Sequence, residues 1–137
     1  LTEPIRNAHQ FLTFCAATPL QVAASEALRA PSTYFAEYTD AYRQRRDLLV
    51  AGLRNVGFNV QSPEGTYFIL ADHTPFGFDD DIAFCHHLVD RCKVVGIPPS
   101  AFYTKSDEGK GLVRFAFCKG LDTLNNAVER LQGLASS

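Results

Sequence analysis

The chain has 137 residues, of which 46% are hydrophobic and 20% charged, and its formal net charge at pH 7 is -2. This is the composition of a soluble globular protein, and the scattered charges give no basic patch for nucleic acid and no polybasic membrane anchor. No apolar run reaches the roughly 20 residues of a membrane-spanning helix. The first residue is Leu1 and no signal-peptide layout follows it, so we expect a piece of a longer chain.

The first half of the chain predicts two helices. A helical apolar spacing follows Thr18-Pro19 and indicates a short helix over residues 19–29. Ser32 then caps a second, longer helix that Gly57 ends. The apolar stripe of this helix comprises Phe35, Tyr38, Tyr42, Leu49, Leu53 and Val56.

After Gly57 the apolar period changes to two, which is typical of strands. Phe58 and Val60 alternate with polar residues, a Pro-Glu-Gly turn follows at 63–65, and residues 66–71 are almost continuously apolar. This pattern predicts a hairpin of two antiparallel strands.

The second half predicts a helix, two strands and a last helix. Acidic residues at 79–81 favour a helix start, and residues 94–97 form a short strand closed by two prolines. Residues 111–118 form another strand, and Asp122 is expected to cap the last helix. The expected buried positions of the two helices are Ile82, Cys85, Leu88, Val89 and Cys92, and then Leu124, Val128, Leu131 and Leu134.

Helices and strands mixed along the chain predict an α/β or α+β layer architecture. We expect a three- to four-stranded sheet packed with helices. No internal repeat or long linker divides the sequence, so residues 1–137 are read as a single unit.

One charged residue stands in an otherwise apolar strand. Between residues 112 and 118 every residue except Arg114 is apolar, and strand alternation places Arg114 on the face of Leu112, Ala116 and Cys118. A guanidinium stays charged at working pH, and leaving it desolvated and unpaired costs several kcal/mol. Arg114 must therefore meet an anion or reach water.

Two kinds of anion could serve Arg114. One is a carboxylate of the chain itself, such as that of Glu64 or Asp72, in an internal ion pair. The other is a ligand carboxylate, which the planar guanidinium matches with two parallel hydrogen bonds. The small Ala116 would leave space for such a ligand. The strand alone does not separate the two readings.

Four phrases of the sequence resemble class I aminotransferases in order and spacing. They are HQFLTFCAATPLQVAASEAL (9–28), PEGTYFILAD (63–72), VVGIPPSAFY (94–103) and GLVRFAFCKGLDTLNNAVERL (111–131). The chain is similar to the branch with kynurenine aminotransferases, glutamine transaminase K and methionine aminotransferases. The resemblance implies the C-terminal small domain of a fold type I enzyme, including a long interdomain helix within the linking helices 19–56.

The resemblance assigns two substrate-binding residues. The arginine of the VRF phrase falls on Arg114, which in the family binds the α-carboxylate of the amino acid and then of the 2-oxo acid. The aromatic after the HQ pair falls on Phe14, which in relatives lines the side-chain pocket of the neighbouring subunit, although a core position is the alternative. Tyr67 lies near the substrate in such folds, and Pro99 replaces a glycine that many relatives have.

The cofactor implied by the resemblance is pyridoxal 5'-phosphate, and the implied partners are an amino acid, a 2-oxo acid and a second subunit. The large domain of the family, with its Schiff-base lysine and most phosphate ligands, lies upstream of this chain. We therefore assign no catalytic or cofactor-binding residue here, and expect the isolated chain to be inactive. Its four lysines, Lys93, Lys105, Lys110 and Lys119, do not fall in the family's lysine phrase.

Two other functions remain open from the sequence. The chain could be a stand-alone helix-sheet module that binds a partner, with Arg114 in an internal ion pair. On the same scaffold, a pyridoxal-phosphate C–S β-lyase or an aminocyclopropane-carboxylate synthase would use the same residues for a different reaction.

The histidines and cysteines predict no metal site. His86 and His87 are adjacent on a helix and point about 100° apart, while His9 and His73 stand alone. The four cysteines, Cys15, Cys85, Cys92 and Cys118, show no CxxC spacing. Reduced thiols are expected, in the cytoplasm or an organelle lumen.

Overall fold

The computed structural model describes residues 1–136, with the side chains at 13, 106, 135 and 136 left out of the description. The described residues form two compact units, Leu1–Tyr38 and the part that begins at Thr39. Both units share the helix α3 (Ser32–Val56), which is continuous across the division.

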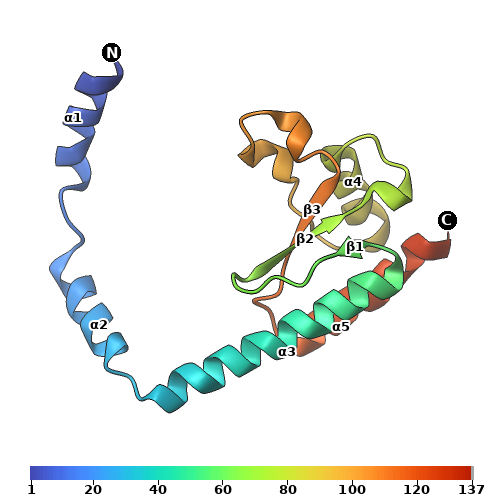
Figure 1. Ribbon diagram of the computed structural model, residues 1–137, viewed down its shortest axis with the longest axis horizontal. Coiled ribbons are helices and arrows are strands. Elements are labelled where there is room, and N and C mark those ends of the chain that lie inside the picture. The colour runs from blue at the N-terminus through green and yellow to red at the C-terminus, as the bar shows by residue number, and fades with distance from the viewer. Residues whose placement is uncertain (137) are drawn as a thin grey trace. The chain divides into compact units, whose positions relative to one another are not determined.

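The first unit is made of helices only (Figure 1). It contains α1 (Thr2–Thr13), α2 (Thr18–Leu28) and the beginning of α3. The prediction of α2 is confirmed, with Pro19 in its first turn. Helix α1 is not among the elements predicted from the sequence, and Leu1 at its N-cap provides no capping side chain. Phe35 and Tyr38, expected in a buried stripe, are 44% and 52% exposed.

The second unit contains a three-stranded antiparallel sheet with the order β1-β2-β3. The strands are β1 (Asn59–Val60), β2 (Phe68–Asp72) and β3 (Leu112–Ala116). β1 and β2 form the predicted hairpin, with Val60 opposite Ala71. Gly57 ends α3 just before β1 with a φ of 115°, in the region that favours glycine.

The predicted strand at 94–97 is wrong, because only Ile97 pairs with the sheet, through one bridge to Arg114. Two physical reasons account for the difference. Pro98 and Pro99 have no backbone N–H with which to extend the ladder. In addition, Gly96 lies tightly over the side chain of Val113, so this segment packs against the sheet more than it pairs with it.

Helices α4 (Asp81–His87) and α5 (Leu121–Leu131) complete the unit, and α4 continues into a π-helical turn over Leu88–Cys92. Asp80 caps α4 by accepting a 2.7 Å hydrogen bond from the N–H of Ala83, which agrees with the acidic helix start. The expected cap at Asp122 is wrong, because Gly120 occupies the N-cap and Asp122 lies in the first turn.

The core lies between the sheet and the helices α3, α4 and α5. Its buried residues are Leu49, Val50, Leu53, Val56, Phe58, Ile69, Ala71, Phe84, Cys85, Leu88, Cys92, Val94, Val113, Phe115, Phe117, Leu124, Leu131 and Leu134. The predicted burial of Ile82 and Val89 is wrong, since they are 52% and 42% exposed. Phe84 fills the core from α4 instead.

Candidate functional site

Arg114 lies at the centre of β3, where hydrogen bonds fix its backbone. Its N–H and C=O both form 3.0 Å hydrogen bonds with Ile97, and its cross-strand neighbour in β2 is Leu70. Val113 and Phe115 on either side of it are buried in the core. Because side chains alternate along a strand, Arg114 belongs to the opposite face of the sheet, which it shares with Leu70.

Three aromatic rings surround the Arg114 guanidinium. Its Cζ lies 4.1 Å from the ring centroid of Phe68, 5.5 Å from that of Tyr67 and 5.9 Å from that of Phe102. These distances lie within the range of about 6 Å over which a ring face attracts a cation. Nη2 also donates a 3.1 Å hydrogen bond to the hydroxyl of Tyr67. The positive charge of Arg114 therefore lies among neutral groups, three aromatic rings and one hydroxyl.

No carboxylate of the described part of the chain forms a salt bridge with Arg114, and its Nε is buried without a hydrogen-bond partner there. Asp72, one of the two acids considered for an internal pair, instead accepts hydrogen bonds from Thr74 and Asn59. Burial favours a higher pKa for Asp72, but these hydrogen bonds prevail and the pKa is lowered. Glu64 is exposed.

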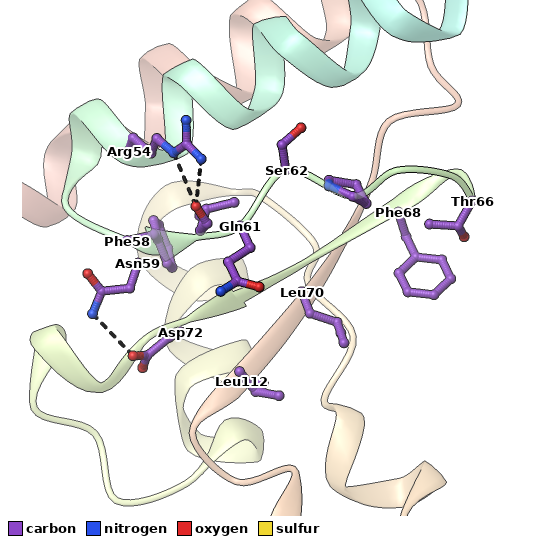
Figure 2. A pocket seen from close by; sticks show the side chains of 12 residues that line it. Arg54, Phe58, Asn59, Gln61, Ser62, Thr66, Phe68, Leu70, Asp72 and Leu112 are labelled. Carbon is purple, nitrogen blue, oxygen red and sulfur yellow. Dashed lines mark hydrogen bonds between the residues drawn. The ribbon is translucent and has the colours of Figure 1, made fainter. Parts of the chain in front are cut away.

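A cavity of about 790 Å³ lies over β1 and β2 beside this face of the sheet. Figure 2 shows Phe68 and Leu70 of β2 among its lining, with Arg54 of α3 at the opposite side. Arg54 donates two hydrogen bonds, of 3.1 and 2.8 Å, to the carbonyl of Val60 and so ties β1 to α3. The cavity adjoins the Arg114 site through Phe68, which lines the cavity and also lies under the guanidinium.

A second cavity, of about 500 Å³, is bordered by β3 and α5. Arg114 and Ala116 line one side of it, and Thr123 and Asn126 of α5 line another. The small side chain of Ala116 thus does leave open space next to the arginine.

Phe14, the second predicted site residue, lies in the first unit at the C-terminal end of α1. Its side chain is 84% exposed, so the alternative of a core position does not hold among the described residues. Its φ is 41° and its ψ is -69°, and a positive φ is uncommon for a residue with a bulky side chain.

Two aromatic residues beside Arg114 are missed by the sequence reasoning. Phe68 stands directly opposite Ala116 in the sheet, and the β2–β3 register with side-chain alternation places it on the face of Arg114. Phe102 ends the short 3₁₀ turn η3 (Pro99–Phe102). It comes to Arg114 from a loop whose path has no local sequence signal.

Other chemical groups of the second unit are engaged elsewhere. Among the described residues, no group of three or more His, Cys, Asp or Glu could hold a metal ion. His73 is buried, with Nε2 2.8 Å from the Lys110 carbonyl oxygen and its ring stacked on Phe84 at 4.5 Å. None of the described helices combines the length and the apolar character needed to cross a membrane.

Comparison with known proteins gives consistent matches over nearly the whole chain. The family model for aminotransferase class I and II matches residues 2–131. The probable N-succinyldiaminopimelate aminotransferase of Mycobacterium tuberculosis is 40% identical over 96% of this chain and 35% of its own length. The methionine aminotransferase of Escherichia coli is 39% identical over 98% of this chain and 34% of its own length.

The fold agrees with these matches. The solved structure of N-succinyldiaminopimelate aminotransferase from Mycobacterium tuberculosis superposes with a TM-score of 0.81 at 42% identity, over 95% of this chain and 34% of that one. The chain therefore spans about a third of the length of the relatives it matches.

Proposed function

The chain belongs to the class I and II aminotransferase family, and on that premise we propose that it is the C-terminal part of an aminotransferase that moves an amino group between an amino acid and a 2-oxo acid. Arg114 binds the α-carboxylate of both substrates. The observation behind this assignment is a guanidinium on the sheet face away from the core, without a carboxylate partner among the described residues.

The surroundings of Arg114 suit the reversible binding of a substrate carboxylate. Tyr67 accepts a hydrogen bond from Nη2 only, so N–H groups on Nη1 and Nη2 remain for two parallel hydrogen bonds to a substrate. The rings of Phe68 and Phe102 lower the local dielectric and stabilise the cation while no substrate is bound. The site can therefore exist in both the empty and the loaded state.

Pyridoxal phosphate is the cofactor of this family, and when bound it supplies an electron sink for the bonds at the substrate Cα. We propose that none of the four lysines of this chain carries it. All four lysines are exposed, and Lys93 and Lys110 already engage the Asp90 carbonyl and the Asp107 carboxylate. We propose that the upstream part of the protein holds the cofactor, and we expect the isolated chain to be inactive.

The contribution of Arg114 is orientation. A carboxylate held by two hydrogen bonds cannot rotate freely, and this fixes which bond at Cα is presented to the reacting group. Because the Arg114 backbone is hydrogen-bonded to Ile97 at the edge of the sheet, the position of the Cα that carries the guanidinium side chain is fixed. The same residue serves both half-reactions, since amino acid and 2-oxo acid share the carboxylate.

We further propose that the full-length enzyme is a homodimer in which Phe14 lines the side-chain pocket of the neighbouring subunit. The exposure of Phe14 and its unusual φ support this role, because strained backbone is often kept where function needs it. The substrate side chain is of the kynurenine, glutamine, methionine or aromatic type. The relatives named above act on different amino acids, so this preference stays a prediction, as does an intracellular location.

Substitution of Arg114 in the full-length enzyme tests the proposal. We expect Arg114→Ala to raise the KM for amino acid and 2-oxo acid alike by about 10- to 100-fold, the loss of one or two charge-assisted hydrogen bonds. The cofactor absorbance should stay unchanged. Arg54→Ala is the matched control, since it removes a cation whose hydrogen bonds among the described residues go to the Val60 carbonyl, and it should leave both KM values near the parent. Parental kinetics in Arg114→Ala would contradict the proposal.

The products distinguish transamination from β-elimination on the same scaffold. Elimination from a cysteine conjugate gives pyruvate and ammonia without an acceptor, whereas transamination needs a 2-oxo acid. Turnover that requires the acceptor supports the proposed reaction, and turnover without it supports the β-lyase alternative.

A further inference from the structure

Asp81 is a buried carboxylate in the second unit with one specific partner. It is 1% exposed at the start of α4, and its Oδ2 accepts a 2.7 Å hydrogen bond from the backbone N–H of Ser100. Its Oδ1 is buried and has no hydrogen-bond partner among the described residues. A buried carboxylate that is only half satisfied is a poor source of stability. We therefore expect the role of Asp81 to lie in the backbone segment that it binds through Ser100.

Asp81 holds one end of the loop 99–110. Ser100 lies in η3 at the beginning of this loop, and Gly109 near its end packs against it so closely that an added Cβ would lie 2.6 Å from the Ser100 nitrogen. At the same end, the Lys110 carbonyl is in hydrogen-bond contact with the buried His73. The loop is thus tied to the core at both ends, by Asp81 and by His73.

The charge of Asp81 also reaches the far end of the loop. The pKa of Lys110 is raised, first by its hydrogen bond and charge interaction with Asp107 and to a lesser extent by the charges of Asp80 and Asp81. The close approach of Gly109 to Ser100 shows that the two ends of the loop lie close together, and Asp81 is bound to the first of them.

The same loop brings Phe102 to the guanidinium of Arg114. Phe102 follows Ser100 by two residues, and its ring centroid lies 5.9 Å from the Arg114 Cζ. The side chain is 68% exposed, so packing of its own ring does not fix it there. The ring follows the backbone of η3, and the Asp81–Ser100 hydrogen bond is the side-chain contact that ties this backbone to α4.

We infer that Asp81 is a positioning residue for the substrate-carboxylate site, acting through Ser100 and η3 to keep the Phe102 ring against Arg114. The inference rests on the proposed role of Arg114. The ring shields one side of the guanidinium from water and so strengthens its hydrogen bonds to a carboxylate. Asp81 itself touches no substrate.

The test uses the full-length enzyme with its cofactor, and the probe is whichever of 2-oxoglutarate and pyruvate the parent accepts better. Asp81→Ala should raise the KM of this 2-oxo acid about tenfold, equivalent to about 1.4 kcal/mol, with kcat within about twofold of the parent. Phe102→Ala should give a similar rise. Asp81→Asn should stay near the parent, because its amide oxygen can still accept from the Ser100 N–H.

The double variant separates positioning from general destabilisation. If Asp81 acts through Phe102, adding Asp81→Ala to Phe102→Ala should not raise the KM further. The matched control is Asp80→Ala, which removes the adjacent acid that caps α4. It should lower the thermal midpoint without changing the KM. If Asp81→Ala does not fold, Asp81→Ser takes its place, because the hydroxyl is too short to reach the Ser100 N–H.

Three results would overturn the inference. They are an Asp81→Ala KM within twofold of the parent, fully additive effects in the double variant, and an Asp81→Asn variant as impaired as Asp81→Ala. Arg114→Ala, measured in parallel, shows which proposal has failed. If it raises the KM while Asp81→Ala does not, only the inference about Asp81 is wrong. If Arg114→Ala also leaves the KM unchanged, the proposed function itself is wrong.

Discussion

The two units of the chain use apolar side chains in opposite ways. In the second unit, residues such as Leu53, Ile69 and Phe84 are completely buried. In the first unit, α2 has no buried residue, and Phe11 and Leu20 are 75% and 67% exposed. Among the described residues, apolar side chains therefore form a packed core in the second unit and none in the first. We expect the stability of the chain to depend on the second unit.

The largest difference in unfolding free energy is expected between two Phe→Ala substitutions, one in each unit. Phe84 is fully buried and contacts the rings of Phe58, Phe76 and Phe78. Phe84→Ala should lower the free energy of unfolding by about 3 to 5 kcal/mol, the usual cost of removing a core ring. Phe11→Ala, the same change at an exposed site, should cost less than about 0.5 kcal/mol. Urea denaturation measures both, and equal losses would contradict the contrast between the units.

A smaller loss is expected where α3 packs closely on α5. A Cβ added to Gly52 would lie 2.3 Å from a methyl carbon of Val128, so Gly52→Ala should cost about 1 to 3 kcal/mol through overpacking. Adding Val128→Ala should restore part of that loss, because it removes the methyl groups in the way. A double variant no more stable than Gly52→Ala would show that this contact is not the cause.

The cap of α4 should contribute less again. Asp80 accepts the N–H of Ala83, and Asp80→Ala should reduce the free energy of unfolding by about 1 kcal/mol. Thermal denaturation measures the change, with Asp79→Ala as a control. If the two variants lose the same stability, the loss comes from removing a negative charge near the helix N-terminus and not from removing the cap.

A pH-dependent effect should appear in the alkaline range. Burial, with a smaller contribution from the charge of Asp81, raises the pKa of Cys85 from its ordinary 9.0 to about 11. The folded state thus binds the thiol proton more tightly than the unfolded state, so this stabilisation is complete below pH 9.0 and is lost as the pH rises to about 11. Urea midpoints should fall less over this range in Cys85→Ala than in the parent. Cys15→Ala in the first unit should follow the parent.

The periodic parts of the fold could be predicted from the sequence, because period and end signals agree there. Thr18-Pro19 and Gly57 set the limits of helices, and the change of period after Gly57 gives the hairpin. The strand at 94–97 could not be predicted correctly, since apolar residues there pack over Val113 instead of pairing. The burial of Ile82 and Val89 is predicted wrongly for a related reason. Which face of a short helix is buried depends on where the sheet lies, and the sequence of the helix does not give that position.

The candidate site could be predicted at Arg114 and, through the family resemblance, at Tyr67, which contacts it. A lone arginine in an apolar strand is a local signal, and Arg114 was found by it. A loop brings Phe102 to this region, whereas Asp81 stands at the start of α4. Their places follow from contacts such as Asp81–Ser100 between residues far apart in the sequence. Such contacts leave no periodic pattern, so reasoning from one sequence passes over them.

The paired hydrogen bonds between Arg114 and Ile97 have a consequence for how this position tolerates change. They involve only main-chain atoms, and the guanidinium contributes nothing to them. Different side chains can therefore be exchanged at 114 on an unaltered peptide scaffold, and the amide proton there should remain slow to exchange with deuterium in every variant. Selection or engineering could thus change which anion this strand recognises without having to rebuild the sheet beneath it.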